Sequence, residues 1–332
     1  MPSSLTLPII DISAFTTSPK NNDKIRRELK IKTAQKIHEA CRDVGFFYLT
    51  GHNVPQEICE QVLKLANEFF HLEDAEKMKL SILNEDMARG YQRLGENVTK
   101  YQKDWHEALD YYKPITRDHY LAKNNLPLRG KNQWPTNPLE FKEVFEKYVN
   151  YMINLGEKVM SAIALGLGLE ENFFEKFLDD PFWVMRVIGY PPLDSSEGTD
   201  RVGVSCGEHT DYGCLTFLNQ DNTREALQVQ TKEGEWIYAN PIPGSFIVNI
   251  GDMLNVWTND VYRSTLHRVI HKGNSYRVSV PFFYEPNFDA KIEPLKRCLE
   301  INPVKRYDSV IYGEHLLKKV SGNFEIVDKQ AS

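Results

Sequence analysis

The chain contains two histidine–carboxylate pairs separated by one residue, and only one of them suits a metal ion. His209 and Asp211 come just before an apolar run that is expected to be a strand. In extended backbone, residues i and i+2 point to the same face, so this imidazole and this carboxylate can reach one ion. His71 and Glu73 continue a helical pattern instead, and on a helix such residues point in nearly opposite directions. We therefore expect His209 and Asp211, but not His71, to form part of a metal site.

A third ligand is expected from residues 264–271, which carry His267 and His271. This segment is rich in β-branched residues and should be a strand, on which the two histidines share a face but stand about 13 Å apart. Only one of them can therefore join the site, and the spacing does not decide which. Two histidines and one carboxylate with open positions are typical of non-haem Fe(II) oxygenases, although a catalytic zinc accepts the same ligands.

An anion site is expected beside the metal. Arg277 follows His267 by ten residues, and Arg277 and Ser279 take positions i and i+2 of a predicted strand. The guanidinium offers a planar fork to a carboxylate, and the hydroxyl adds another donor. An arginine by itself more often pairs with a surface acid, but beside this set of histidines and aspartate the anion site is the better interpretation.

The elements that must position these residues change character near residue 183. Before it, apolar residues at helical spacing predict helices over about 22–44, 58–70 and 137–166, with short strands at 7–11 and 45–49. Asn137 and Pro138 give the last helix an expected N-cap and first residue. After it, short β runs between Gly and Pro turns predict a sandwich or barrel, at residues 184–190, 214–219, 227–230, 236–238, 245–250, 264–271 and 276–284. The predicted fold class is therefore α+β.

A polar stretch over residues 84–137 precedes the long helix. Only residues 107–112 within it have a clear pattern of regular structure. A structureless loop of this length inside a compact domain is usually functional, so we expect a lid or an insert that contacts the substrate.

The composition excludes several classes of protein. Among 332 residues, 40 Lys and Arg face 46 Asp and Glu, and this formal net charge of −6 argues against a nucleic-acid partner held by its phosphates. No apolar run approaches the roughly 20 residues needed to cross a bilayer, and the first residues do not resemble a secretory signal. The five cysteines are odd in number and widely spaced, so we expect reduced thiols in the cytoplasm or the nucleus.

Ordered matches along nearly the whole chain indicate a family. They lie at residues 7–11, 44–48, 51–55, 207–213, 227–229, 249–252, 264–269 and 277–283. Together these segments resemble the isopenicillin N synthase-like group of Fe(II)/2-oxoglutarate-dependent oxygenases. So many matches in the same order are far more specific than any single motif.

The resemblance implies a double-stranded β-helix, or jelly-roll, core with flanking helices. It divides the chain into an α-rich N-terminal region (1–180), the oxygenase core (181–290) and a C-terminal helical extension (291–332). It also implies that His209, Asp211 and His267 are the metal ligands, and that His271 is not.

The resemblance further implies a site for 2-oxoglutarate. Arg277 and Ser279 match the pair that holds the far carboxylate of this cosubstrate, and Tyr190 matches a tyrosine that assists there. The substrate side is expected in the polar stretch, where Arg89, Tyr91 and Asp104 locally resemble segments of the family that face the substrate.

The implied activity is hydroxylation, or another oxidation, of a small-molecule substrate. It requires Fe(II), uses 2-oxoglutarate and O2 with ascorbate as a reductant, and releases succinate and CO2. Three alternatives stay open, namely an iron oxidase of the same fold that does not use 2-oxoglutarate, a zinc hydrolase and a barrel that only binds. We expect a monomer without nucleic-acid or membrane partners.

Overall fold

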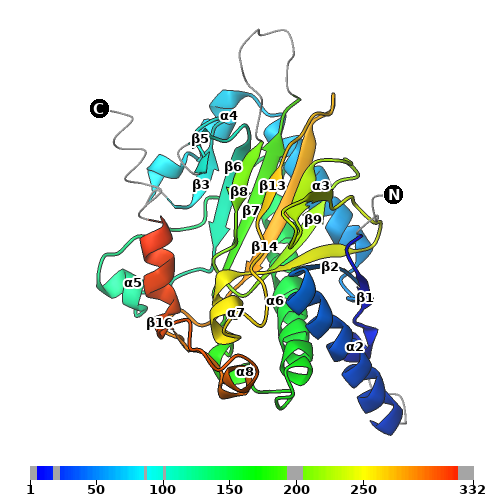
Figure 1. Cartoon of the computed structure of the whole chain (residues 1–332). Helices are drawn as coiled ribbons and strands as arrows, with labels where there is room; N and C mark the ends of the chain where they lie inside the picture. The colour runs from blue at the N-terminus through cyan, green and yellow to red at the C-terminus, as the bar shows by residue number, and fades with distance from the viewer. Residues whose placement is uncertain (1–5, 18–22, 86–87, 100–101, 193–204, 321–332) are drawn as a thin grey trace.

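A computed structural model of the chain describes residues 6–17, 23–85, 88–99, 102–192 and 205–320 (Figure 1). The long helices form where the sequence is amphipathic. In the longest helix, Phe141–Gly166, one face carries buried residues such as Phe145, Tyr148 and Met152, and charged residues occupy the other face. Residues 312–320 are also helical. The named helices are α1 (Ser13–Thr16), α2 (Asp23–Asp43), α3 (Gln56–Phe70), α4 (Asp74–Met78), η1 (Ile82–Asn84), α5 (Tyr120–Lys123), α6 (Phe141–Gly166), η2 (Glu175–Phe177), α7 (Asp252–Trp257) and α8 (Lys296–Ile301).

The strands are short, as the spacing of turns predicts, and most of their residues are buried. They are β1 (Ile9–Asp11), β2 (Phe46–Thr50), β3 (Gly90–Gln92), β4 (Val98–Thr99), β5 (Gln102–Lys103), β6 (Glu107–Tyr112), β7 (Trp183–Tyr190), β8 (Cys206–His209), β9 (Leu215–Gln220), β10 (Leu227–Gln230), β11 (Trp236–Tyr238), β12 (Phe246–Ile250), β13 (His267–Val269), β14 (Arg277–Tyr284), β15 (Lys291–Ile292) and β16 (Val310–Ile311). In β14 every residue except Phe283 is buried, which requires cover on both faces of the sheet.

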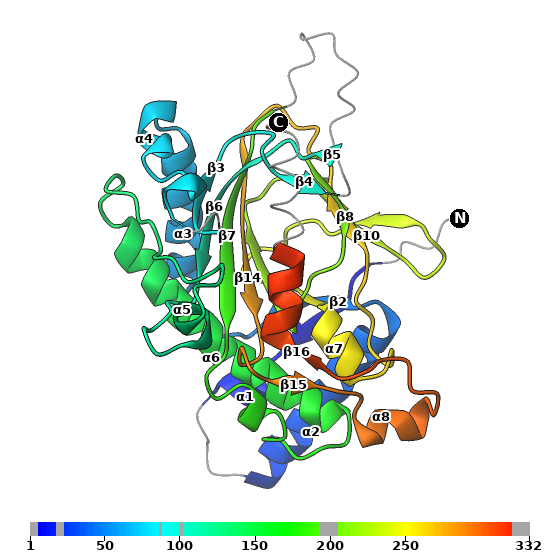
Figure 2. The same ribbon diagram turned by 90° about the vertical axis from the view of Figure 1, so that its left-hand side faces the viewer.

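From β7 to β14 the strands pass back and forth between two sheets. In the described part of the chain, β7, β9, β12 and β14 belong to an eight-stranded sheet with the order β1-β2-β12-β9-β14-β7-β6-β3. The strands β8, β10, β11 and β13 form a four-stranded sheet with the order β11-β10-β13-β8. Figure 2 shows β7 and β14 on one side of the barrel and β8 and β10 on the other. This topology is a double-stranded β-helix, so the predicted α+β fold with a jelly-roll core is confirmed.

The larger sheet is not built from residues 181–290 alone. At one edge β2 pairs with β12, with Phe47 opposite Val248, and β1 continues the sheet beyond β2. At the other edge β6 pairs with β7, with Glu107 opposite Gly189, and β3 follows β6. The N-terminal region therefore supplies the outer strands at both edges of the core sheet.

Helices of the N-terminal region cover the outer face of this sheet. Both α3 and α6 contact β14, and α2 packs on α6 (Figures 1 and 2). The close approach of α6 depends on Gly156, because a Cβ at this position would lie 2.4 Å from the ring of Tyr284. The long helix thus braces the strand that carries the predicted anion site.

The predicted start of the long helix is wrong. Helix α6 begins at Phe141, and its N-cap is Glu140 rather than Asn137. The amide of Phe141 donates to the carbonyl of Pro138 at 3.2 Å, so residues 138–141 form a turn that leads into the helix. The predicted end at Gly166 is confirmed.

The polar stretch at residues 84–137 is more regular than predicted. Besides β6 it contains the strands β3, β4 and β5 and the helix α5. Each of these has between two and four residues. Elements of this length are too short to show a period of 2 or 3.6 in the sequence, because such a pattern needs several repeats.

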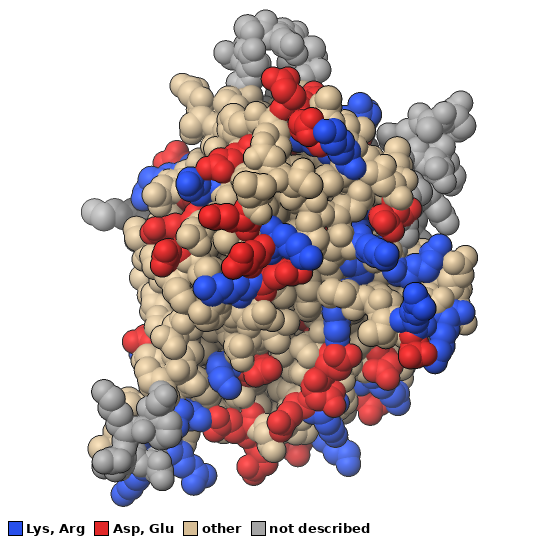
Figure 3. Space-filling view, turned by 180° about the vertical axis from the view of Figure 1, so that it is seen from behind, with Lys and Arg blue, Asp and Glu red and all other residues tan. Residues whose placement is uncertain are grey.

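The surface carries interspersed charges of both signs on the face that Figure 3 shows. None of the helices that the structure describes is long and apolar enough to cross a membrane. The observed surface is consistent with the weak net charge of the sequence.

We predict that Gly156→Ala lowers the free energy of unfolding by about 1–3 kcal/mol, although Ala is the better helix former. The added methyl group would overlap the ring of Tyr284 and push α6 away from β14. Chemical denaturation measures the change. Glu157→Ala, at the next and exposed position of the helix, serves as control and should change the free energy by less than about 0.5 kcal/mol. Equal stability of Gly156→Ala and wild type would contradict the packing described here.

Candidate metal centre and substrate pocket

The structure brings His209, Asp211 and His267 together between the two sheets. His209 ends β8 and His267 begins β13, and the two residues are direct partners in the antiparallel pairing. Their Nε2 atoms lie 3.7 Å and 3.6 Å from Oδ1 of Asp211, respectively. Three ligand atoms therefore converge on one point, and this arrangement could hold a divalent ion.

Backbone carbonyls orient the two imidazoles. Nδ1 of His209 lies 2.7 Å from the carbonyl of Gly207, and Nδ1 of His267 lies 3.1 Å from that of Thr265. With each Nδ1–H donated to a carbonyl, the Nε2 lone pair is left for a metal, which is the usual outer support of a histidine ligand.

The carboxylate of Asp211 is held from the larger sheet. Its Oδ2 accepts hydrogen bonds from the hydroxyl of Thr216 on β9 and from Nδ2 of Asn249 on β12, the latter at 2.6 Å. Thr216 and Asn249 are themselves paired across the two strands. Only Oδ1 therefore remains for a metal.

Electrostatics favour the ligating form of two of these three side chains. Burial opposes the charged carboxylate, but the imidazoles of His267 and His209 and the bonds to Oδ2 outweigh it and lower the pKa of Asp211 below its usual range. Burial, and next the neighbouring His209, lower the pKa of His267 to about 4. Burial also opposes the charge of His209, but Cys206 and then Asp211 outweigh it and raise the pKa of His209 to about 10. Metal binding requires the neutral form of both imidazoles and the charged form of the carboxylate.

The other two candidate histidines lie outside this group. Nε2 of His271 is 2.7 Å from the carbonyl of Ser275, so this ring takes part in a local turn. Nδ1 of His71 is 2.8 Å from the carbonyl of Asn67 at the end of α3. The structure thus separates both residues from the metal centre, as the sequence analysis expected.

A buried cationic group faces the interior of the barrel at the start of β14. Arg277 is 1% exposed, and its Nη2 donates to Oε1 of Gln220 at 2.9 Å. Nε and Nη1 of Arg277 and Nε2 of Gln220 are buried, and the described part of the chain offers them no hydrogen-bond acceptor. A buried cation without a counter-ion is costly, so these donors fit an anionic ligand such as a carboxylate.

The two other predicted cosubstrate residues lie beside this guanidinium. Tyr190 is the direct partner of Arg277 across β7 and β14, and the guanidinium carbon lies 4.7 Å from the centre of its ring. Burial raises the pKa of Tyr190 to about 12, so its hydroxyl stays protonated at neutral pH. Ser279 is buried two residues further along β14, opposite Gln220.

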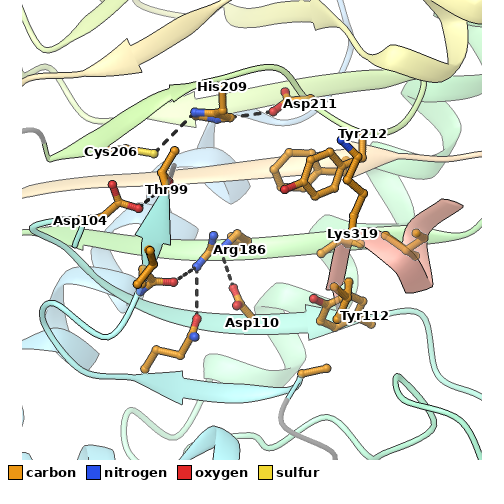
Figure 4. A pocket seen from close by; sticks show the side chains of 18 of the residues that line it. Thr99, Asp104, Asp110, Tyr112, Arg186, Cys206, His209, Asp211, Tyr212 and Lys319 are labelled. Carbon is orange, nitrogen blue, oxygen red and sulfur yellow. Dashed lines mark hydrogen bonds and ion pairs between the residues drawn. The ribbon is translucent and has the colours of Figure 1, made fainter. Parts of the chain in front are cut away.

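A cavity of about 440 Å³ adjoins the metal centre (Figure 4). Its walls come from β6, β7 and β8, from the end of β14 and from the helix at residues 312–320. Arg186 lies in its wall and is held by Asp110 at 2.8 Å and by the side chain of Asn97 at 2.7 Å. At another part of the wall, Nζ of Lys319 lies 5.0 Å from the centre of the ring of Tyr212.

Glu285 also lines this cavity and is 3% exposed. Its Oε2 accepts a long hydrogen bond of 3.2 Å from the amide of Cys214. Burial and the nearby charge of Asp211 raise the pKa of Glu285 to about 8. A cationic group of a ligand placed beside Glu285 would favour its charged form.

Of the three predicted substrate-side residues, only Asp104 lines the cavity. Its two oxygens accept from the hydroxyl of Thr99 at 2.7 Å and from the amide of Gly207 at 2.9 Å. It also lies within 4.8 Å of ligand atoms of His106 and Cys206, a second group of metal-ligand side chains.

The prediction that Arg89 and Tyr91 face the substrate is not supported by their positions. Arg89 is fully buried, and its guanidinium donates to the carbonyls of Tyr112, Lys113 and Leu128. The hydroxyl of Tyr91 donates to Oε2 of Glu107, which also accepts from Lys77. Neither residue is part of the cavity wall. The prediction failed because a local resemblance in the sequence does not tell on which face of a short strand a side chain lies.

Several residues at the site escaped the sequence analysis. Some of them form hydrogen bonds to the predicted site residues, and the others line the cavity. The sequence gives little indication of them, because a single Gln, Asn or Glu at the end of a strand is common. Asn249 lay inside a segment that matched the family, so it was the easiest to find. The missed residues are Gln220, Thr216, Asn249, Arg186, Glu285 and Lys319.

Comparison with protein families agrees with this geometry. Residues 7–137 match the N-terminal region described for the non-haem dioxygenase in morphine synthesis. Residues 182–286 match the 2OG-Fe(II) oxygenase superfamily, and these include both histidines and the aspartate of the centre.

The similarity to curated relatives extends over almost the whole chain. The protein is 45% identical over 322 residues to homoarginine-6-hydroxylase 2-ODD-233 of Oryza sativa subsp. japonica, covering 96% of this chain and 97% of the relative. It is 46% identical over 325 residues to homoarginine-6-hydroxylase 2-ODD-C23.1 of Arabidopsis thaliana, covering 96% and 98%.

Solved structures give the same result. A full-length Neurospora crassa protein in complex with alpha-KG and thymine matches with a TM-score of 0.82 and 27% identity, over 97% of this chain and 98% of that one. JOX2 in complex with 2OG, Fe and JA matches with a TM-score of 0.72 and 28% identity, over 93% and 83%. The family resemblance and the activity expected from the sequence are thereby confirmed, and the chain belongs to the 2OG-Fe(II) oxygenase superfamily as a 2-oxoglutarate-dependent dioxygenase that oxidises a small molecule.

Proposed function

We propose that this enzyme hydroxylates homoarginine or a closely related amino acid whose side chain ends in a guanidinium group. The observation that carries the proposal is the identity of 44–46% with four plant homoarginine-6-hydroxylases over 96% of this chain. The charges of the cavity agree with it. An amino acid with a cationic side chain presents a carboxylate at one end and a cation at the other, so it needs basic and acidic groups at separate points of one pocket.

Two basic side chains are suited to the carboxylate of such a substrate. Arg186 is fixed by Asp110 and Asn97, and 28% of its side chain is exposed in the wall of the cavity. Lys319 approaches from the helix at residues 312–320 and packs on Tyr212. A fixed guanidinium binds a carboxylate without losing further side-chain freedom.

We assign His209, Asp211 and His267 as the ligands of Fe(II). Their fit rests on the two Nε2 atoms that converge on one carboxylate oxygen. When bound together with 2-oxoglutarate and O2, the iron supplies the oxidation of a C–H bond, with release of succinate and CO2, and ascorbate keeps it reduced. The protein holds the ligands, orients the substrate and limits the access of water.

We assign Arg277, Ser279 and Tyr190 to the far carboxylate of 2-oxoglutarate, and add Gln220. The unpartnered donors of Arg277 and Gln220 within the described residues support this assignment. Asp104 remains our candidate on the substrate side because it lines the cavity.

We also retain three wider proposals. The sequence divides at residues 180 and 290 into the N-terminal region, the core and the C-terminal extension, and the two family matches, at residues 7–137 and 182–286, fall within the first two parts. The protein acts as a monomer in the cytoplasm, in keeping with five cysteines that are all in the thiol form. Light scattering tests the oligomeric state, and fractionation of cells tests the compartment.

We predict that Asp211→Ala abolishes stoichiometric binding of Fe(II), because it removes the carboxylate oxygen on which both imidazoles converge. Metal analysis after anaerobic loading and dialysis measures the bound iron, and circular dichroism verifies the fold. His271→Ala is the matched control and should retain one iron per chain, since this histidine binds Ser275 instead. Full iron content and activity in Asp211→Ala would refute the assignment.

We predict that Arg277→Ala raises the concentration of 2-oxoglutarate needed for half-maximal turnover by about 100-fold and leaves the iron bound. The reason is that a buried carboxylate of the cosubstrate would lose its counter-ion. Succinate formation as a function of 2-oxoglutarate concentration gives the value. Arg297→Ala, at an exposed position, is the control. An unchanged requirement would show that Arg277 serves another ligand.

The substrate proposal is tested with homoarginine, Fe(II), ascorbate and 2-oxoglutarate under air. We expect a product heavier by one oxygen atom and one succinate for each hydroxylated molecule. Arginine, which is shorter by one methylene group, should react more slowly because its side chain reaches less far along the cavity. Succinate formation that is equal with and without every guanidino amino acid would reject the proposal.

A further inference from the structure

The carboxylates of the cavity differ in what neutralises them. Glu96 pairs with Arg93 at 2.8 Å, Asp110 pairs with Arg186, and Glu208 pairs with Arg268 at 2.9 Å. These ion pairs leave little charge for a ligand. The cavity therefore has fewer available acidic groups than its composition suggests.

The two carboxylates that remain beside the metal ligands are Asp104 and Glu285. Both oxygens of Asp104 accept hydrogen bonds of ordinary length. The described residues give Glu285 one hydrogen bond, from the amide of Cys214 at 3.2 Å, and no cationic partner. A buried carboxylate with only neutral partners costs stability unless a ligand brings the cation.

The backbone makes room for Glu285 at this point. A Cβ added to Gly213 would lie 1.2 Å from Oε2 of Glu285, so the carboxylate rests directly against the loop that follows Asp211. Any residue other than glycine would displace it. The position of the acid is therefore built into the same loop that carries a ligand of the metal centre.

We propose that Glu285 binds the guanidinium group of the substrate and thereby selects the carbon atom that is hydroxylated. This inference rests on the proposed function. In homoarginine, carbon 6 is bonded directly to a guanidinium nitrogen. A guanidinium held against the loop of Gly213 places that carbon beside Asp211, while the carboxylate of the substrate extends towards Arg186 or Lys319. Glu285 acts by charge and position, and no covalent step involves it.

The test compares homoarginine with homocitrulline, in which a neutral urea of almost the same shape replaces the guanidinium. Wild type should prefer homoarginine by about 100-fold in kcat/KM, because the neutral group forgoes the ion pair with a buried carboxylate. Glu285→Gln should lose this preference, since the amide keeps the shape of the side chain but removes its charge. Product analysis by mass spectrometry gives both rates and the position of the hydroxyl group.

Two controls separate recognition from folding. Circular dichroism should show the same fold for Glu285→Gln and wild type, and Glu293→Gln on the surface should behave as wild type in every assay. If Glu285→Gln does not fold, Glu285→Asp keeps the charge and should keep the preference for homoarginine, with a higher KM.

The outcomes are distinct. Suppose that wild type converts homoarginine, but Glu285→Gln still prefers homoarginine to homocitrulline, or Glu285→Asp, tested in its place, loses this preference. The role of Glu285 is then overturned and the proposed function stands. If wild type converts no guanidino amino acid, the proposed function fails and the inference fails with it.

Discussion

The meeting of two imidazoles on one carboxylate oxygen is the constraint on which the rest of this structure depends. The histidines come from paired strands of the smaller sheet, whereas the second oxygen of Asp211 is fixed by Thr216 and Asn249 from the larger sheet. The metal centre therefore spans the barrel. The relative positions of the ligand atoms therefore depend on the distance between the two sheets. Helices α3 and α6 support the larger sheet from its outer face.

Strand β14 connects the residues that we propose for the two reaction partners. Arg277 begins the strand and Glu285 follows its end, about 26 Å away at 3.3 Å per residue. The carboxylate of Asp211 is tied to Thr216, which pairs with Phe283 between these two points. With the roles proposed for Arg277 and Glu285, cosubstrate and substrate would approach the metal from opposite ends of this one strand.

The sequence was sufficient for the parts of the site that follow local rules. His209 and Asp211 were found because an extended chain puts them on one face, and the choice of His267 needed the family resemblance because spacing alone left two histidines. Glu285 and Lys319 could not be found in this way. Each reaches the pocket through strand register or helix packing across the molecule, and a single polar residue at the end of an element carries no periodic signal.

The outer strands of the larger sheet have a consequence for how the chain folds during synthesis. Strand β2 is made early, but its partner β12 follows about 200 residues later, and a contact of such long sequence separation forms slowly. Until then the open edge of β2 can pair with other chains. While the chain is being synthesised, the larger sheet therefore stays open at this edge until β12 has emerged from the ribosome.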